Sequence, residues 1–304
     1  MKKVIITGAT GMIGVSLINF LVKQNIEVLA IIRENSLRKN NIPKNKNIKI
    51  IECNLEKLKD LSLPERDYDV FYHFGWDGTF GGSRNDISLQ EKNIKYTLES
   101  VNLAKRCGCK KFIGAGSQAE YGRVDGLIDE NTNTNPETQY GKAKLKAGIE
   151  SRILANNLKI EHIWTRIFSS YGPYDGKNTM IMTSIREMLK GNSPEYTKGE
   201  QNWDYLFSED LSEMFYLLGQ HGKGNNTYCL ASGKTQKLYE YIKIIRNIIN
   251  PNIKLKLGSI PYSEKQVMNL NVNIDKFVLD FKYRPKTSFE KGIEKTIDWY
   301  KKLL

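Results

Sequence analysis

Short apolar runs alternate with longer amphipathic segments over the first half of the chain, and this alternation predicts the fold. Six of the runs have the length and the β-branched or aromatic content of strands; they are residues 3–8, 27–33, 48–53, 69–75, 110–117 and 161–168. The segments between them repeat apolar residues at helical spacing, as in 13–24, 93–107 and 140–157. Strands that alternate with helices form βαβ units, and nearly continuous apolar strands are typical of a sheet covered on both faces. The pattern therefore predicts an α/β fold with a Rossmann-type, doubly wound parallel sheet.

After residue 172 the pattern becomes less regular, beginning with the turn-rich segment "YGPYDGKN". Helical patterns follow at 179–191, 208–220 and 288–304, with one further strand near 227–232. We expect the helix at 208–220 and this strand to return to the sheet, which then has seven strands. This divides the chain into a larger domain, residues 1–172 plus about 204–248, and a smaller C-terminal domain, about 173–203 plus 249–304.

Composition narrows the class of protein. No apolar run approaches the roughly 18 residues of a membrane-spanning helix, and the start of the chain lacks a signal-peptide pattern, so a cytoplasmic location is expected. The net charge of +12 is spread along the chain without a nucleic-acid-binding motif, which disfavours a nucleic-acid partner but helps to attract an anionic substrate. The four cysteines lack metal-ligand spacing, so we expect reduced thiols and no metal.

The first strand is followed by "TGATGMIG", in which Gly8, Gly11 and Gly14 are three residues apart. Alone, such a motif also suits an ordinary tight turn. Between a strand and a helix, however, the glycines permit the turn, the approach of a pyrophosphate and close helix–strand packing. Unpaired N–H groups at the helix start then face the phosphates. The motif predicts a dinucleotide site in the larger domain, formed by Gly8, Thr10, Gly11, Met12, Ile13 and Gly14.

The end of the second strand bears on which dinucleotide is bound. NAD sites usually have an acidic residue here for the ribose 2′-hydroxyl. This strand ends in Arg33, whose guanidinium can pair with a 2′-phosphate, and this favours NADP(H). The alternative is NAD(H), with Glu34 on the ribose and Arg33 exposed.

A candidate catalytic set follows the fifth strand. Tyr140 and Lys144 are four residues apart in a helical pattern, so they lie on one helix face. The lysine can lower the tyrosine pKa from its reference of about 10, which makes Tyr140 a proton donor or acceptor. Ser117 ends the preceding strand and can hydrogen-bond the same substrate oxygen.

Together these motifs resemble the extended short-chain dehydrogenases/reductases of the nucleotide-sugar epimerase/dehydratase type. The landmarks span nearly the whole chain: "TGATGMIG", "HFGW", Asn93 in "QEKNIKYTLESV", "GSQAEYG", "YGKAK", "RIFSSYGPYDG", "GEQNWDYLFSEDL" and "SFEKGIEKTIDWY". The resemblance implies hydride transfer at a nicotinamide, with Ser117, Tyr140 and Lys144 as the triad. It implies a homodimer formed through the helices at about 88–107 and 140–157, and a substrate-binding role for the smaller domain.

The resemblance also assigns binding residues. The cofactor set comprises the glycine loop, Arg33, Asn54, Leu55, Phe74, Gly75, Trp76, Asn93, Tyr140, Lys144 and Ile167. The set that faces a nucleotide-sugar substrate comprises Ser117, Gln118, Ser169, Tyr171 and Trp203.

Departures from the family pattern narrow the reaction. Dehydratases of this type have an Asp-Glu pair where this chain has Gln118 and Ala119, so water elimination is disfavoured. Ala119 also replaces the cysteine of bifunctional epimerase/reductases. Trp203 stands where the family often has arginine, and Ile167 where it often has proline.

We therefore predict an NADPH-dependent 4-ketoreductase of a nucleotide-linked 4-keto-6-deoxy sugar, in sugar biosynthesis for surface polysaccharide. The alternative is an NAD-dependent nucleotide-sugar 4-epimerase, which uses the same triad but holds its cofactor tightly. A second alternative is a non-catalytic nucleotide-binding protein on the same fold, since fold alone does not determine function.

Overall fold

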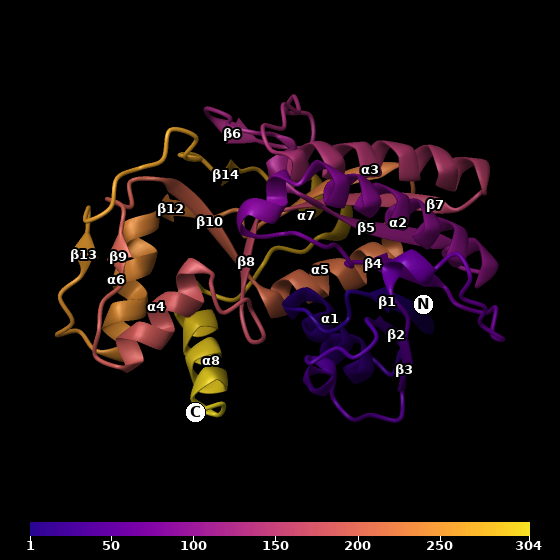
Figure 1. Ribbon diagram of the computed structural model, residues 1–304, viewed down its shortest axis with the longest axis horizontal. Coiled ribbons are helices and arrows are strands. Elements are labelled where there is room, and N and C mark those ends of the chain that lie inside the picture. Colours follow the sequence, from indigo (N-terminus) through magenta and orange to yellow (C-terminus); the bar gives the residue numbers. More distant parts are fainter.

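The computed structural model describes residues 1–304 and has two lobes (Figure 1). The sheet lobe is built on seven parallel strands in the order β11-β7-β5-β4-β1-β2-β3. These strands are β1 (Lys3–Thr7), β2 (Glu27–Ile32), β3 (Ile48–Glu52), β4 (Val70–His73), β5 (Lys111–Ser117), β7 (Glu161–Ile167) and β11 (Asn226–Leu230). The seven-stranded parallel sheet predicted from the apolar runs is confirmed.

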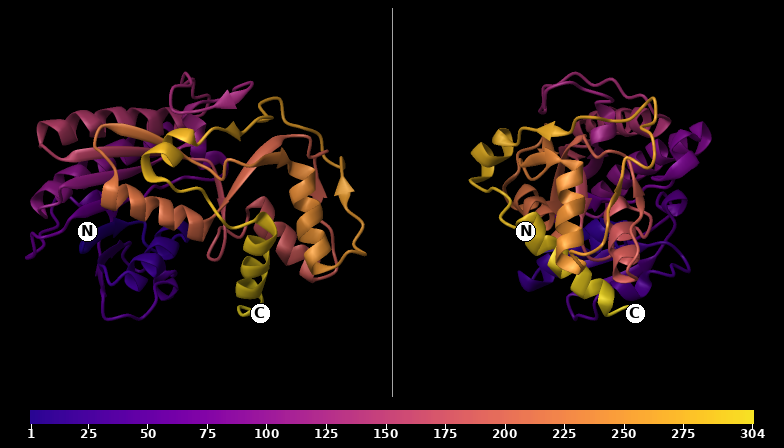
Figure 2. Two further views of the ribbon diagram at one scale, coloured as in Figure 1. Left: turned by 180° about the vertical axis from the view of Figure 1, so that it is seen from behind. Right: turned by 90° about the vertical axis from the view of Figure 1, so that its left-hand side faces the viewer.

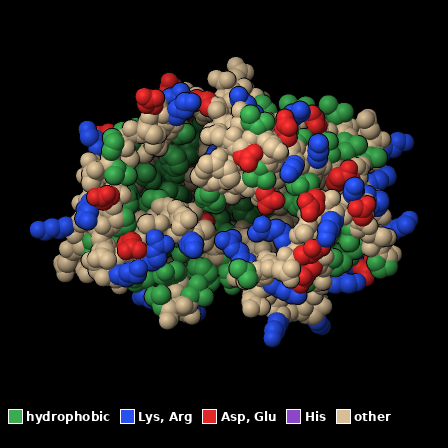
Figure 3. All heavy atoms as spheres, in the orientation of Figure 1, with side chains coloured by type: hydrophobic (Ala, Val, Ile, Leu, Met, Phe, Trp, Pro, Cys, Tyr) green, Lys and Arg blue, Asp and Glu red, His purple; other side chains and the backbone are tan.

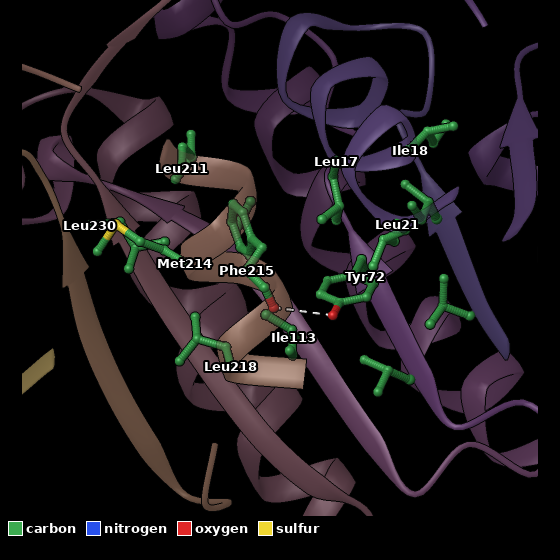
Figure 4. Packing of buried hydrophobic residues seen from close by; sticks show 14 of the residues in the cluster. Leu17, Ile18, Leu21, Tyr72, Ile113, Leu211, Met214, Phe215, Leu218 and Leu230 are labelled. Atoms are coloured by element: carbon green, nitrogen blue, oxygen red, sulfur yellow. Dashed lines mark hydrogen bonds between the residues drawn. The ribbon is translucent and has the colours of Figure 1, made fainter. Parts of the chain in front are cut away.

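Helices cover both faces of this sheet. The helices α1 (Met12–Lys23) and α5 (Ser208–His221) pack on one face, and α2 (Ile87–Arg106) and α3 (Gln139–Asn157) on the other. Successive strand side chains point to opposite faces, so Val4 and Ile6 join the first core while Ile5 joins the second. In the first core, the Tyr72 hydroxyl donates to the Phe215 carbonyl at 3.1 Å (Figure 4). Burial of both faces explains why the strands are apolar throughout.

The small lobe is built on a three-stranded sheet in the order β12-β10-β8, and Figure 2 shows it from behind. Its strands are β8 (Ser169–Tyr171), β10 (Asn202–Phe207) and β12 (Thr235–Lys237), and its helices are α4 (Met180–Leu189), α6 (Leu238–Ile249) and α8 (Phe289–Lys301). Two short parallel pairs complete the strands: β9 (Glu195–Tyr196) with β13 (Lys256–Leu257), and β6 (Leu127–Ile128) with β14 (Asn271–Val272). A separate apolar core fills this lobe, so it has its own source of stability.

The packing differs from the domain boundaries expected from the sequence, which place the three strands of the small-lobe sheet wholly or mostly in the larger domain and misassign two helices. The boundary at about residue 248 assigns α6 to the larger domain, but Ile242 and Ile245 lie in the small-lobe core. The helix α7 (Asp275–Phe281) falls within the predicted smaller domain, yet Phe277 packs in the sheet-lobe core beside Tyr228. The assignment of substrate binding to the small lobe stays a prediction.

No helix of the structure has the length and apolarity needed to cross a bilayer.

The strand order reverses between β1 and β4, and this reversal places the site. The chain leaves β1 toward β2 on one side, whereas β4 lies on the other side of β1. In open α/β sheets, ligands bind at such a switch point, beyond the carboxyl ends of the strands. Here the turn after β1 meets the loop after β4: a Cβ added to Gly8 would lie 2.6 Å from the Phe74 carbonyl carbon.

Candidate active site

Two adjoining cavities open at this switch point. The larger, of about 790 Å³, runs along the glycine turn and the end of β2, and we call it the cofactor cavity. The second, of about 520 Å³, reaches from the end of β5 to the small lobe, and we call it the reaction cavity. They share lining residues: Met12, Ile13, Phe74, Trp76, Thr79, Phe80 and Asp175. Figure 3 shows the molecule hollowed between its two lobes, with hydrophobic side chains in the hollow.

The glycine turn provides a backbone cradle for phosphates. Gly8 has a φ of +66°, which favours glycine, and a Cβ on Gly14 would lie 2.5 Å from the Gly8 carbonyl oxygen. A Cβ on Gly11, by contrast, would meet only that oxygen, at 3.6 Å, because Gly11 faces open space in the cofactor cavity. The helix α1 starts directly after Gly11, with its N–H groups at the cavity. The residues present therefore suit a dinucleotide pyrophosphate.

The end of β2 presents cations to the same cavity. Arg33 is 70% exposed at its side chain, and its guanidinium lies 3.6 Å from the Asp77 carboxylate. The Glu34 carboxylate accepts hydrogen bonds from Lys57 at 2.9 Å and from the Asn54 amide at 3.2 Å. Glu34 is thus already engaged, whereas Arg33 keeps donors available toward the cavity.

The reaction cavity brings Ser117, Tyr140 and Lys144 together. Ser117 ends β5, and the other two lie on the first turn and a half of α3, which Thr138 caps by accepting from the Gly141 N–H. The Lys144 amine donates to the Ala115 carbonyl at 2.6 Å and lies 3.7 Å from the centre of the Trp76 ring. Trp76 also contacts Tyr140 edge to face, with ring centres 6.0 Å apart.

Burial sets the protonation of this group. It raises the pKa of Tyr140, although a hydrogen bond with Ser117 and the positive charge of Arg84 act in the opposite direction. Burial lowers the pKa of Lys144 to about 7, with the negative charge of Glu120 opposing the shift. At neutral pH, the Lys144 amine is therefore close to the midpoint of its titration.

Lys144 should make stability depend on pH. The unfolded chain protonates this amine with a pKa near 10.5, whereas the folded chain does so near 7. The cost of burying the charge is therefore complete below pH 7 and is relieved as pH rises from 7 to about 10.5. We expect Lys144→Met to raise Tm more at pH 6 than at pH 9. Thermal unfolding at both pH values tests this, with Lys142→Met, at an exposed site of α3, as control; a gain that does not vary with pH contradicts it.

Glu120, the acid near the end of β5, lies behind the cavity. It belongs to the short helix η4 (Gln118–Glu120) and is completely buried. Its carboxylate accepts from the Ser117 N–H at 2.8 Å, from the Trp164 indole at 3.0 Å and from the Arg166 guanidinium at 2.9 Å. Glu120 therefore fixes the backbone at Ser117 and does not face a substrate.

Most of the residues predicted for the site line the cavities. They are Gly8, Gly11, Met12, Ile13, Gly14, Arg33, Asn54, Phe74, Trp76, Ser117, Tyr140, Lys144, Ile167, Ser169 and Trp203. Thr10, Leu55, Gly75 and Gln118 are absent from both linings. Leu55 instead packs against Gly75, where a Cβ would approach its Cδ2 to 2.9 Å.

Two further predicted residues lie elsewhere for clear physical reasons. Asn93 is buried in α2, where its amide accepts from the Asp77 N–H and donates to the Asp77 carbonyl, each at 2.9 Å. It braces the loop after β4 from behind. Tyr171 is buried in the small-lobe core, and its hydroxyl donates to the Phe289 carbonyl at 3.2 Å. Neither side chain reaches a cavity wall.

The structure also adds residues that the sequence patterns did not single out. Arg84, in the short helix η3 (Gly81–Asn85), lines the reaction cavity with its guanidinium 4.3 Å from the centre of the Tyr140 ring. Asp175 lies where the cavities join and accepts from the Gly176 N–H and the Thr179 hydroxyl; burial raises its pKa to about 6. Their only sequence signals were the glycine-rich stretches "GTFGGSRND" and "YGPYDGKN".

Known proteins resemble this chain along its whole length. It is 26% identical to a putative UDP-glucose 4-epimerase of Methanocaldococcus jannaschii over 98% of both chains. It is 22% identical to CDP-abequose synthase of Salmonella muenchen over 97% of both chains. Among solved structures, the UDP-N-acetylglucosamine 4-epimerase of Methanobrevibacter ruminantium, in complex with UDP-N-acetylmuramic acid, matches with a TM-score of 0.90 at 22% identity and covers 100% and 99% of the two chains.

A family profile confirms the resemblance inferred from the motifs. The profile of the NAD dependent epimerase/dehydratase family matches residues 4–231, from the first strand of the sheet to just beyond its last. Family membership brings a nicotinamide cofactor, for which the cofactor cavity has suitable residues. The chain therefore belongs to the NAD dependent epimerase/dehydratase family, of the extended short-chain dehydrogenase/reductase type.

Proposed function

We propose that this protein is an NADPH-dependent 4-ketoreductase that acts on a nucleotide-linked 4-keto-6-deoxy sugar. The charged groups of the reaction cavity carry this proposal. Its charged lining residues are Arg84, Lys144 and Asp175, so Asp175 is the one carboxyl group in its lining. That set supports one proton transfer and lacks the acid/base pair that water elimination requires. The product would be a deoxysugar nucleotide of the kind used in surface polysaccharides.

In the proposed carbonyl reduction, each residue of the triad has a separate role. A nicotinamide held along the cofactor cavity would supply the hydride for reduction at C4 of the sugar. Tyr140 donates its phenolic proton to the C4 oxygen as negative charge develops there, and Ser117 orients that oxygen by hydrogen bonding. The Lys144 ammonium stabilises the tyrosinate left behind until Tyr140 regains a proton from solvent.

The electrostatics of the cofactor cavity support NADP(H). Arg33 and Arg38 both line this cavity near the end of β2. Glu34, the residue available to a ribose 2′-hydroxyl, is held by Lys57 and Asn54. A 2′-phosphate would meet cations here, and charge-assisted hydrogen bonds contribute about 1.5–3 kcal/mol.

The first test is the nucleotide released when the purified protein is denatured, identified by mass spectrometry. An empty site or NADP(H) supports the reductase, and stoichiometric NAD(H) overturns it.

We expect NADPH to bind more tightly than NADH. Arg33→Met should reduce NADPH affinity by about 10- to 100-fold while sparing NADH. Calorimetric titration with both cofactors measures this, and Lys46→Met, in an exposed loop away from the cavity, serves as control.

A 4-epimerase is the second candidate. Solved structures named as 4-epimerases match this chain over at least 99% of both lengths, including a UDP-glucuronic acid 4-epimerase of Bacillus cereus solved with NAD. An epimerase would use Ser117, Tyr140 and Lys144 in both directions and retain its cofactor between them. Stoichiometric NAD(H) in the purified protein would therefore select this reaction, which an assay of C4 inversion without added cofactor then tests.

The homodimer remains a prediction with local support on α3. Leu145, Ile149 and Ile153 are four residues apart and form an aliphatic stripe; Ile149 and Ile153 are more than half exposed. Since α2 packs beside α3, the same pair from a second copy would bury this stripe. A monomeric mass at micromolar concentration would contradict the dimer.

A further inference from the structure

Arg84 lies on a braced platform at the reaction cavity. The loop from Trp76 to Asp86 is held by α2: the Gln90 amide donates to the Gly78 and Ser83 carbonyls at 2.9 and 3.0 Å and accepts from the Trp76 indole at 2.9 Å. Gln90 is only 1% exposed. A buried amide that satisfies three loop groups fixes the loop in one course, so the position of Arg84 is built into the fold.

The orientation of Arg84 is fixed as well. One of its terminal nitrogens donates to the Thr79 carbonyl at 3.1 Å, which leaves its other donors free. The guanidinium then lies over the face of the Tyr140 ring, 4.3 Å from its centre, within the range of a cation–π contact. The Asn85 side chain accepts from the Gln139 N–H at 3.3 Å, which ties this loop to the start of α3.

The other groups around Tyr140 do not place a positive charge against its ring that persists above neutral pH. Lys144, on the same helix, is drawn toward Trp76 and the Ala115 carbonyl, and its amine lies 5.8 Å from the centre of the Tyr140 ring. Burial lowers the Lys144 pKa to about 7, so its charge declines above neutral pH. From η4, the negative Glu120 opposes ionisation of Tyr140, although Arg166 pairs with it, and from β5 Ser117 offers only a hydroxyl. A guanidinium, in contrast, stays protonated throughout this pH range.

We propose that Arg84 is a positioning residue that holds a permanent positive charge against Tyr140 and so supports its proton transfer. This inference rests on the proposed role of Tyr140 as proton donor. It extends the triad by a cation from a different element, the loop after β4. A buried charge within about 4–6 Å of a titrating group shifts the pKa of that group by about 1–3 units. Arg84 is half-exposed, so its effect on the pKa of Tyr140 should be smaller.

The test is a direct titration of Tyr140 in the full-length protein. Protein labelled with 3-fluorotyrosine gives a fluorine resonance for each of its 16 tyrosines, and the one missing from Tyr140→Phe identifies the site. The fluorinated phenol ionises at lower pH than tyrosine, which keeps the titration where the fold survives. We expect Arg84→Gln to raise the Tyr140 midpoint by about one pH unit. Arg84→Lys, which keeps a charge, should recover at least half of that shift, and Lys142→Gln, exposed on α3, should give none.

Each outcome decides the matter. A midpoint unchanged in Arg84→Gln overturns the inference, and so does Arg84→Lys behaving like Arg84→Gln, since the charge would then not be the cause. The pH profile of kcat/KM gives a second readout: its limb assigned to Tyr140 should move to higher pH with the midpoint. Failure to reduce any 4-keto sugar nucleotide would remove the proposed function while leaving the titration result intact, so the two failures are distinguishable.

Discussion

Replacing Tyr140 with phenylalanine is expected to lower kcat by about 10²- to 10⁴-fold, the usual contribution of a positioned general acid. The change removes one oxygen atom and keeps the ring, which Arg84 and Trp76 contact. Without the phenolic proton, the C4 oxygen would develop negative charge with Ser117 as its remaining donor among the triad. Steady-state reduction of a 4-keto sugar nucleotide, followed by loss of NADPH absorbance, measures the effect.

The controls separate chemistry from folding and binding. Tyr140→Phe should keep the wild-type Tm and NADPH affinity to within a few-fold, because its ring stays in place. Tyr96→Phe removes the same atom from a half-buried tyrosine of α2 that lines neither cavity, and should keep near-normal kcat. Near-normal turnover by Tyr140→Phe would exclude this mechanism.

The sheet lobe could be predicted from the sequence because its signals are strong and local. Strands buried on both faces are apolar at nearly every position, as in Val4, Ile5 and Ile6, so they stand out from the helices between them. The glycine turn is equally local, because only a residue without a Cβ fits at position 8, where φ is positive and the backbone of Phe74 is close. In both cases, the cause of the structure lies within a few residues of the signal.

The small lobe could not be predicted to the same extent. The strand β10, Asn202–Phe207, mixes polar and aromatic residues, so no clear alternation marks it, and its partner strands β8 and β12 are distant in sequence. The strands β9 and β13 have only two residues each, too few for any periodicity. The position of α6 depends on its partners α4 and α8, which are distant in sequence.

The contrast between local signals and long-range packing also explains which residues of the site could be predicted. Ser117, Tyr140 and Lys144 follow from spacing and order along the chain, and the structure brings them to one cavity. The roles of Asn93 and Arg84 depend on the course of the loop after β4. That course is determined by buried amides of α2, and so by tertiary packing. The sequence pattern singled out Asn93 as a cofactor-binding residue. In the structure its side chain instead hydrogen-bonds the backbone of Asp77 and does not line a cavity.

Glu120 illustrates how the role of an acidic residue close to the site depends on packing. An acid three residues after Ser117 suggests added chemistry, yet every hydrogen bond of its carboxylate goes to the protein. Its partner Arg166 is nearly buried and also donates to the Tyr121 hydroxyl at 2.9 Å. The pair anchors the end of β5, and through it Ser117, so losing one partner should affect both stability and the site.

Arg166→Met is therefore expected to lower the free energy of unfolding by about 3–5 kcal/mol, since it leaves the Glu120 charge buried without a counter-ion. Urea unfolding at pH 7 measures this. The exposed pair Arg123–Glu137 provides a matched control, because its guanidinium Nε also lies close to a carboxylate, at 2.8 Å. Water screens that pair, so Arg123→Met should cost no more than about 1 kcal/mol.

A second variant distinguishes an unpaired charge from lost packing. Glu120→Gln combined with Arg166→Met removes both charges but keeps an amide oxygen that can accept from the Ser117 N–H and the Trp164 indole. If the stranded charge causes the loss, the double variant should be more stable than Arg166→Met alone, with a coupling of about 0.5–3 kcal/mol. Additive losses would instead assign the cost to the space that the Arg166 side chain fills, and the anchoring of Ser117 would then be a matter of packing and not of charge.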